Sequence, residues 1–402
     1  MDKISTQRGC VRTTRDVKHP HPILESFDMK FVCAPDSFKE SISASDAAAA
    51  LAQGIHRILP DAECVEIPMA DGGEGFTEAL ADALGARRVS VDLLNALGEQ
   101  ATGTIAVTPD RAVMEVAEAV GIAMVAPERR RIRAMQSFGV GQLILAALDE
   151  GVTEILIGLG GSGTNDAGAG MLRALGFVFL DHDGAELDGS PESLTRLARI
   201  DTSGADPRLS GVTFRVACDV DNPLLGERGA SAIFGPQKGA SPEDVRFLDQ
   251  ALRNFADVAG HLDGPALAEG AGAAGGLGYA MVAFLGAELA SGIDLVVETV
   301  GLKDAIRGAD FVFTGEGAMD RQTLMGKTLS GVARVAVPAG VPIVAFAGKL
   351  GDGVEELYDH GFVALMPIVD GVTDLAGALA HGRENLANAS ERATRLLMAG
   401  RR

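Results

Sequence analysis

Apolar and polar positions follow a repeated strand-then-helix order along most of this chain. Residues 30–34 and 63–68 are short runs rich in apolar and β-branched side chains, and an alanine-rich segment from Ser43 to about Ile58 lies between them. Short runs of this kind bounded by turn residues predict strands, and alanine-rich segments opened by Ser and Asp predict capped helices. The start of the chain proper therefore predicts β-loop-α-β.

The same rhythm returns further along the chain and predicts an α/β fold. Residues 87–118 alternate apolar and polar side chains on both sides of a turn at 97–99, which predicts a β-hairpin. A capping pattern at Ser241 starts another helix. Further strands are predicted at 154–159, 212–218, 310–313, 341–347 and 363–368, with helices at 279–290 and 375–398.

Residues 1–28 do not share this rhythm. They mix charged side chains with His19-Pro20-His21-Pro22, and the first predicted strand begins just after Met29. They contain no apolar stretch typical of a secretory signal. We expect this segment to be a disordered tail, or to result from a translation start assigned too far upstream.

Composition narrows the classes of partner. With 402 residues the chain predicts two or three domains; it has 51 glycines, 4% aromatic residues and no Trp. A net charge of −20 argues against nucleic acid or an anionic membrane as partner, so an anionic substrate must meet local lysines, backbone N–H groups or a metal ion. Four scattered cysteines without a CxxC pair fit a reducing compartment. No apolar run is long enough to span a membrane, and we expect a cytoplasmic protein.

The segment 154–180 carries the strongest chemical signal. A predicted strand ends in Gly160, Gly161, Ser162 and Gly163, and a short helix is predicted after Thr164, Asn165 and Asp166. Backbone N–H groups of a glycine turn that leads into a helix form an anion site. The polar side chains beside the turn exceed what a packing turn needs, which favours a binding role.

Polar residues also follow several other predicted strands, where open α/β sheets bind their ligands. The resulting candidate site residues are Asp36, Ser37, Lys39, Asp71, Gly72, Gly73, Glu74, Asp219, Gln237, Lys238, Gly239, Thr314, Gly315, Glu316, Asp320 and Lys327. Several carboxylates together with loop lysines and glycine turns suit Mg²⁺-assisted phosphoryl transfer, which depends on positioning and charge neutralisation.

Two familiar motifs match only in part. Gly326-Lys327-Thr328 resembles the end of a P-loop, but Arg321 occupies the position of its first glycine, so we reject that interpretation. Residues 158–163 form GxGxxG after a predicted strand, with Asp181 at the end of the next one. This spacing leaves an NAD-dependent dehydrogenase as an alternative, although no His or Tyr accompanies the candidate residues.

Taken together, seven blocks resemble the bacterial glycerate kinase family of the glyoxylate- and glucarate-pathway type. They are APDSFKES (34–41), PMADGGEG (68–75), IGLGGSGTNDAGAGMLRALG (157–176), ACDVDNPLLG (217–226), FGPQKGAS (234–241), GAAGGLG (272–278) and TGEGAMDRQTLMGK (314–327). The resemblance implies ATP-dependent phosphorylation of D-glycerate, with 2-phosphoglycerate favoured and 3-phosphoglycerate left open. It also implies a Rossmann-like parallel-sheet domain from residues 29–72 and 295–402, with a second α/β domain, 73–294, inserted in it.

With this resemblance, specific roles can be assigned as hypotheses. The turn at 160–165 and the loop at 235–239 with Lys238 would hold phosphates or the substrate carboxylate. Asp219 and Glu316 would bind Mg²⁺, and Lys39 would neutralise the transferring phosphate. Asp71 is the preferred base and Asp320 the second choice. Glycines 270–278 are a candidate hinge for cleft closure.

The chain departs from the family pattern at Glu40, at 132–138, and at Ala318 and Arg321, which leaves substrate details open. A catalytically silent ligand-binding homologue is a further alternative, and a monomer and a homodimer are both compatible with the sequence.

Overall fold

The computed structural model describes residues 28–70, 75–324 and 328–400. The predictions made for residues 1–27, for Asp71, Gly72, Gly73 and Glu74, and for Lys327 concern residues outside these ranges.

One sheet joins the two ends of the chain. It contains five strands, which are β1 (Lys30–Cys33), β2 (Glu63–Glu66), β11 (Phe311–Met319), β12 (Ile343–Leu350) and β13 (Phe362–Pro367). Their order is β13-β12-β11-β1-β2, and each neighbouring pair is parallel. Counted along the chain within this sheet, the order is 2-1-3-4-5, which is a common doubly wound arrangement. The α/β class with a Rossmann-like parallel sheet is therefore confirmed.

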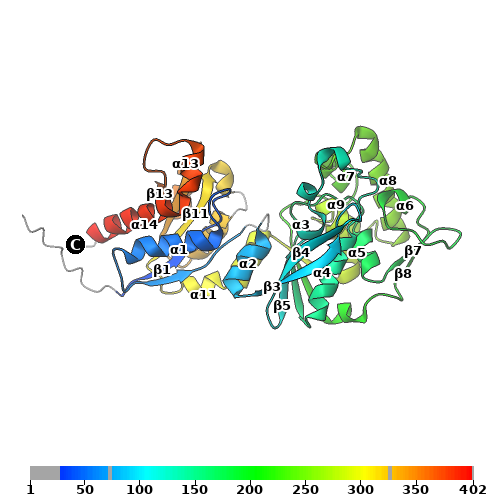
Figure 1. Cartoon of the computed structure of the whole chain (residues 1–402), viewed down its shortest axis with the longest axis horizontal. Coiled ribbons are helices and arrows are strands. Elements are labelled where there is room, and N and C mark those ends of the chain that lie inside the picture. Colours follow the sequence, from blue (N-terminus) through cyan, green and yellow to red (C-terminus); the bar gives the residue numbers. More distant parts are fainter. Residues whose placement is uncertain (1–27, 71–74, 325–327, 401–402) are drawn as a thin grey trace, which may run out of the picture.

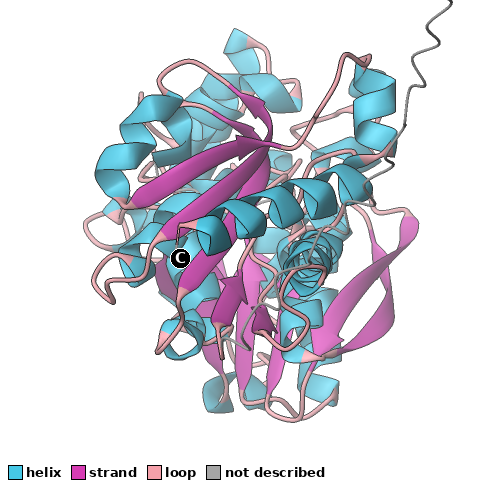
Figure 2. Ribbon diagram, turned by 90° about the vertical axis from the view of Figure 1, so that its left-hand side faces the viewer, coloured by secondary structure: helices cyan, strands magenta, loops and turns pink. Residues whose placement is uncertain are grey.

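Helices cover both faces of this sheet (Figures 1 and 2). On one face, α1 (Ala44–His56) and α14 (Gly382–Ala399) pack on the phenylalanines of β1, β11 and β12. On the other face, α10 (Gly292–Thr299), α11 (Leu302–Ile306) and α12 (Thr328–Ala336) pack on Val32, Val312 and Ala345. Successive residues of a strand point to opposite faces, so strands buried on both sides read as the continuous apolar runs seen in the sequence.

The second sheet is built from the middle of the chain. Its six strands are β3 (Arg87–Leu94), β4 (Gln100–Val107), β5 (Arg111–Glu115), β6 (Glu154–Gly158), β9 (Thr213–Ala217) and β10 (Glu288–Ala290), in the order β10-β9-β6-β5-β4-β3. The predicted hairpin is confirmed, because β3 and β4 pair antiparallel around a turn closed by Asn95 and Glu99. Strands β5, β6, β9 and β10 run parallel.

The two sheets share a hydrophobic cluster. Helix α2 (Phe76–Leu84) and helix α10 lie against β4, β5 and β9, and their apolar side chains cluster with Val113 and Leu156 of the second sheet. Figure 1 shows α2 between the two sheet-centred bodies. The opposite face of the six-stranded sheet packs against α4 (Phe138–Asp149) and α5 (Ala169–Ala174). The division into domains at residues 72 and 295 stays a prediction, and α10 spans the second of these positions.

Shorter elements complete the fold. The remaining α-helices are α3 (Ala117–Val120), α6 (Pro191–Leu194), α7 (Ala230–Phe234), α8 (Pro242–Val258), α9 (Ala273–Leu285) and α13 (Leu375–Ala380). Short 3₁₀ helices occupy Ile122–Met124, Pro127–Arg129, Pro207–Gly211, Pro236–Lys238, Pro265–Leu267, Arg321–Leu324 and Val354–His360. Strands β7 (Val178–Leu180) and β8 (Arg199–Asp201) form a separate antiparallel pair. Across the described ranges, no helix is long and apolar enough to cross a membrane.

Three predicted elements need correction. Strand β11 continues to Met319 instead of ending at Phe313, because residues 312–319 pair with β12. The single C-terminal helix is two helices, α13 and α14, which meet at His381. The helix expected at 279–290 begins earlier, at Ala273, and ends at Leu285, where β10 follows.

Candidate active site

Two cavities of similar size lie at the carboxyl ends of strands, one in each sheet. The β6 cavity has a volume of about 460 Å³ and lies at the ends of β6 and β9. The β1 cavity has a volume of about 450 Å³ and lies at the ends of β1, β11 and β12. The described candidate residues that reach a cavity divide into two groups, one at each.

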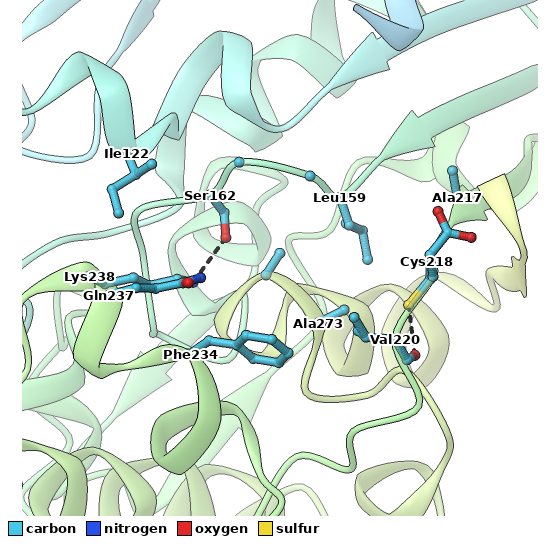
Figure 3. Close-up of a pocket in the computed structure, with 14 residues that line it drawn as sticks. Ile122, Leu159, Ser162, Ala217, Cys218, Val220, Phe234, Gln237, Lys238 and Ala273 are labelled. Carbon is cyan, nitrogen blue, oxygen red and sulfur yellow. Dashed lines mark hydrogen bonds between the residues drawn. The ribbon is translucent and has the colours of Figure 1, made fainter. Parts of the chain in front are cut away.

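The β6 cavity is lined by the predicted glycine turn and by the loop that carries Lys238 (Figure 3). Its lining residues are Ile122, Leu159, Gly160, Gly161, Ser162, Ala217, Cys218, Asp219, Val220, Phe234, Gln237, Lys238, Ala273 and Ala274. Residues Ile122, Cys218 and Phe234 were not selected from the sequence, since an isolated apolar side chain or thiol carries no local signal of a site.

The turn itself is held by backbone hydrogen bonds to a neighbouring segment. The Ile122 N–H donates to the Gly161 carbonyl at 2.8 Å, and the Gly163 N–H donates to the Val120 carbonyl at 2.7 Å. Gly161 has a φ of +70°, which favours glycine. Within the described ranges, the N–H groups of Gly160, Gly161 and Ser162 donate to no other group. These three donors are therefore available to a bound anion.

Lys238 brings a buried cation to this turn. It is 2% exposed, and its Nζ donates to Ser162 Oγ at 3.0 Å and to the Thr164 carbonyl oxygen at 2.7 Å. Burial lowers the pKa of Lys238 to about 7, because the charged ammonium loses its hydration. Figure 3 shows the side chain reaching toward Ser162 along one side of the cavity.

Asp166 lies behind the turn and does not line the cavity. Its carboxylate accepts from the Ser137 N–H at 2.7 Å, the Ser137 hydroxyl at 2.8 Å, and the N–H groups of Gly168 and Gly170. Burial raises the pKa of this carboxyl, and the hydrogen bonds oppose that rise. The geometry fits a role in fixing α5 against α4 better than the contact with ligand expected from the sequence.

Three other members of the polar stretch, Gly163, Thr164 and Asn165, also lie outside the cavity lining. Asn165 Nδ2 donates to Ser231 Oγ at 2.9 Å. Two buried side-chain atoms of this stretch, Thr164 Oγ1 and Asn165 Oδ1, have no hydrogen-bond partner among the described residues. Buried polar atoms of this kind carry a desolvation cost, so the turn retains unused hydrogen-bonding capacity.

The glycine tract at 270–278 is packed against this same turn. Ala274, Gly275 and Gly276 have positive φ inside α9, and a Cβ at Gly275 would come within 2.0 Å of the Thr164 carbonyl oxygen. Such close backbone contact does not fit the flexible hinge that we expected from the tract. Its glycines let α9 approach residues 164–167.

Asp219 links the β6 cavity to the helix shared by both sheets. It follows β9 directly, lines the cavity, and its Oδ1 accepts from the Gly292 N–H at 2.9 Å at the start of α10. Next to it, burial raises the pKa of the Cys218 thiol. The predicted carboxylate at this strand end therefore faces the cavity.

The dinucleotide interpretation of residues 158–163 does not agree with the fold. The helix after the turn, α5, begins at Ala169, so the glycines do not open a helix directly. The strand before Asp181, β7, pairs with β8 and is not a neighbour of β6. Both features differ from a Rossmann nucleotide unit.

The β1 cavity is formed by the carboxyl ends of four strands, β1, β11, β12 and β13, and by α13. Its lining residues are Asp36, Ser37, Phe38, Lys39, Glu40, Ser41, Glu316, Gly317, Ala318, Gly348, Lys349, Ile368, Val369, Leu375, Ala378 and Leu379. The Asp36 N–H donates to the Gly315 carbonyl at 2.8 Å, and its carboxylate accepts from the hydroxyl of Thr328 at the start of α12. These bonds fix the loop after β1 against β11.

Two lysines line the β1 cavity. No ion pair or hydrogen bond joins the side chain of Lys39 or Lys349 to another described residue. Lys39 was predicted from the sequence, whereas Lys349 at the end of β12 was not, because a lone lysine after a strand looks like a surface residue. Both ammonium groups are available to an anionic ligand.

The candidates of β11 have different surroundings. Thr314 is buried and its hydroxyl donates to the Ala34 carbonyl at 2.7 Å, and a Cβ at Gly315 would lie 2.5 Å from the Phe346 carbonyl oxygen. Neither lines the β6 cavity or the β1 cavity. Glu316 does, and its Oε1 accepts from Thr323 Oγ1 at 2.7 Å. Asp320 lines neither of the two cavities, and Gly239 flanks the β6 cavity without lining it.

The two carboxylates predicted to bind Mg²⁺ are not together, since Asp219 faces the β6 cavity and Glu316 the β1 cavity. No group of three or more His, Cys, Asp or Glu suited to a metal occurs among residues 28–70, 75–324 and 328–400. Mg²⁺ commonly binds one or two carboxylates and completes its shell with phosphate oxygens and water. Either carboxylate fits such a substrate-completed site.

Comparisons with known proteins agree on one family. A model of the glycerate kinase family matches residues 31–398. The chain is 44% identical to "Glycerate 2-kinase" of Escherichia coli over 379 residues, 93% of this chain and 99% of that protein. It is 45% identical to "Glycerate kinase" of Halalkalibacterium halodurans over 363 residues, 89% and 96% of the two chains. A crystal structure assigned as glycerate kinase 2 from Salmonella typhimurium LT2 matches with a TM-score of 0.85 at 40% identity, covering 93% of this chain and 99% of that one.

Proposed function

We propose, since this chain belongs to the glycerate kinase family, that it transfers the γ-phosphoryl group of ATP to the 2-hydroxyl of D-glycerate. Family membership makes it a kinase with an alcohol group of glycerate as acceptor. The choice of the 2-hydroxyl is supported by the name of the Escherichia coli relative, glycerate 2-kinase. The product would be 2-phosphoglycerate.

The observation that carries this proposal is the anion receptor of the β6 cavity. Three backbone N–H groups, from Gly160 to Ser162, and the ammonium of Lys238 meet at one turn. Both partners of the reaction are anionic, so a receptor of this kind suits a phosphate or the carboxylate of glycerate. In a chain with a net charge of −20, these local groups supply the attraction that the overall field does not.

Charge on the transferring phosphate also has to be neutralised. We assign this role to Lys39, whose ammonium has no partner among the described residues and which lines the β1 cavity. Asp219 and Glu316 would hold Mg²⁺, which supplies further neutralisation when bound. Asp71, which lies five residues after the end of β2 in the sequence, is proposed as the base that accepts the hydroxyl proton.

The reaction itself provides the test. Purified chain is mixed with ATP, Mg²⁺ and D-glycerate, and the product is coupled to enolase without phosphoglycerate mutase. Enolase signal is expected for 2-phosphoglycerate. Glycerate-dependent ADP without enolase signal would retain the kinase and move the phosphate to the 3-hydroxyl, and an absence of glycerate-dependent ADP would support a catalytically silent homologue.

Two substitutions test the assigned residues. Lys39→Ala and Asp71→Asn are each expected to lower kcat/KM by more than about tenfold, which is about 1.4 kcal/mol of transition-state stabilisation. If both variants stayed within about threefold of the unaltered chain, these role assignments would be wrong.

A further inference from the structure

Apolar side chains make up part of the lining of the β1 cavity. They are Phe38, Ile368, Val369, Leu375 and Leu379, and we call them the apolar wall. Leu375 and Leu379 are four residues apart on α13, so they share one face of that helix. Leu375 is 73% exposed and nearby Val372 is fully exposed. Apolar side chains left exposed at the mouth of a cavity indicate a surface that a ligand covers.

This apolar wall is fixed to the rest of the sheet. The Ser41 hydroxyl donates to the Leu379 carbonyl oxygen at 2.7 Å, which joins α13 to the loop after β1. The Ile368 N–H donates to the Ala347 carbonyl oxygen at 2.9 Å, and the Asp374 side chain caps α13 at the Gly377 N–H. The wall is therefore formed before any ligand arrives, which reduces the entropy lost on binding.

The lining of the same cavity also contains two lysines, beside the acidic residues Asp36, Glu40 and Glu316. Lys39 comes from the loop after β1, and Lys349 comes from the end of β12, with β11 between these two strands. A chain of phosphates spreads its negative charge over several groups, so two separated ammonium groups suit it. In the β6 cavity, the single lysine, Lys238, is bonded directly to the turn.

The position of the β1 cavity in the sheet agrees with this division. Strand order reverses direction between β1 and β11, because β2 lies on one side of β1 and the later strands lie beyond β11. Open α/β sheets bind their ligands at the carboxyl ends of the strands at such a switch point. Residues of the loop after β1 and of the carboxyl-terminal part of β11 line the β1 cavity.

We infer that the β1 cavity is the nucleotide site of this kinase. The purine base would lie against Ile368, Val369 and Leu375, and the phosphates would lie between Lys39 and Lys349. The β6 cavity then receives the carboxylate of glycerate. This inference rests on the proposed kinase function and adds to it the assignment of each substrate to one cavity.

Nucleotide binding to the full chain tests the assignment directly. The probe is MgADP, titrated calorimetrically in the absence of D-glycerate. Leu375→Ser removes part of the apolar wall, and Lys349→Ala removes one cation. Each is expected to raise the Kd of MgADP at least about fivefold, whereas the KM of D-glycerate stays within about twofold.

Matched controls exist in the same body of the protein. Leu396 on α14 is 68% exposed, close to the exposure of Leu375, and it does not line the cavity. Lys303 on α11 is an exposed lysine outside both cavities. Leu396→Ser and Lys303→Ala are expected to leave the Kd of MgADP within about twofold. Unchanged Kd values in Leu375→Ser and Lys349→Ala, or no binding of MgADP to the unaltered chain, would overturn the inference.

Photolabelling locates the base without any substitution. After irradiation with 8-azido-ATP, an adduct on peptides within 362–380 is expected, and an adduct confined to 218–240 would place the base in the β6 cavity instead. Because neither measurement uses turnover, the two proposals can fail separately. A chain that binds MgADP in the β1 cavity but forms no glycerate-dependent ADP would retain the nucleotide site and lose the proposed reaction.

Discussion

The ammonium nitrogen of Lys238 lies 2.7 Å from the carbonyl oxygen of Thr164. This contact joins the 3₁₀ helix Pro236–Lys238 to the turn after β6, so two segments about seventy residues apart depend on one buried cation. Because the same ammonium reaches Ser162 at the cavity wall, its protonation state affects both the shape of the turn and its charge.

A pH dependence of substrate capture follows from the pKa of Lys238, which burial lowers to about 7. The protonated ammonium attracts the anionic substrate, and it is lost as pH rises through that value. We expect kcat/KM for D-glycerate to fall with an apparent pKa near 7, since this parameter reports ionisations of the enzyme form that binds D-glycerate. The measurement is a kcat/KM profile between pH 5.5 and 9 at saturating MgATP. Lys238→Arg stays charged over this range, so its kcat/KM should not fall near pH 7. The same fall in both proteins would show that another group titrates.

The free energy of unfolding should depend on pH in the opposite direction, because of the same lysine. Folding lowers the pKa of Lys238 below the value of about 10.4 for an unfolded lysine, so the unfolded chain binds more protons between about pH 7 and 10. The buried ammonium of Lys238 therefore destabilises the folded state most below pH 7, and this destabilisation decreases as pH rises. We expect the free energy of unfolding of Lys238→Met, relative to the unaltered chain, to decrease by up to about 1.4 kcal/mol per pH unit across this window. Urea unfolding at several pH values measures it, and a pH-independent difference would contradict the buried charge.

Gly275 is expected to be intolerant of a side chain. A Cβ there would lie 2.0 Å from the Thr164 carbonyl oxygen, the group that accepts from Lys238. Gly275→Ala should lower the free energy of unfolding by about 3 kcal/mol or more and also lower kcat/KM. Gly286 is the control, because its φ of +66° is also positive but no atom lies within 4 Å of its Cβ position. Gly286→Ala should lower the free energy of unfolding by about 1 kcal/mol. Equal losses in both variants would show that backbone strain, and not the close contact, causes the destabilisation.

Asp219 can be tested as a magnesium ligand by its charge alone. Asp219→Asn keeps an oxygen that can accept from the Gly292 N–H but removes the negative charge. We expect the Mg²⁺ concentration for half-maximal rate to rise at least about tenfold. Asp221→Asn is the matched control, because Asp221 is exposed and pairs with Arg228 at 2.8 Å on the surface. An unchanged Mg²⁺ requirement in Asp219→Asn would remove Asp219 from the metal site.

Much of the fold was predictable because local pattern and final structure agree. The apolar runs at β1, β6 and β9, the hairpin of β3 and β4, and the cap at Ser241 all appear where the sequence places them. Residues 314–317 were predicted to lie beyond the strand at 310–313, since Thr and Gly are common in turns. Pairing with β12 supplied a ladder that a single segment cannot show.

Site residues divided according to how far their partners lie along the chain. Lys39, Ser162 and Asp219 lie in the loops just after strands, so their position at a cavity could be predicted from the sequence. Asp166 could not be interpreted in this way, because its partner Ser137 is 29 residues away at the start of α4. The burial of Lys238 depends on the packing of its loop against the same turn. The ligand role of a polar residue is thus visible locally, whereas its burial is a tertiary property.

The five-stranded sheet has a consequence for how the protein is made. Lys30 of β1 bonds to Asp310, 280 residues later, and β1 lies between β2 and β11 in the sheet. At about 5–20 residues per second, a ribosome takes on the order of tens of seconds to reach β11 after β1 emerges. During that interval β1 and β2 are a marginal two-stranded pair, whereas every strand of the six-stranded sheet is already synthesised before β11. The middle of the chain is therefore expected to fold first on the ribosome, and the newborn N-terminal strands must wait, exposed to chaperones, for the C-terminal segment to complete their sheet.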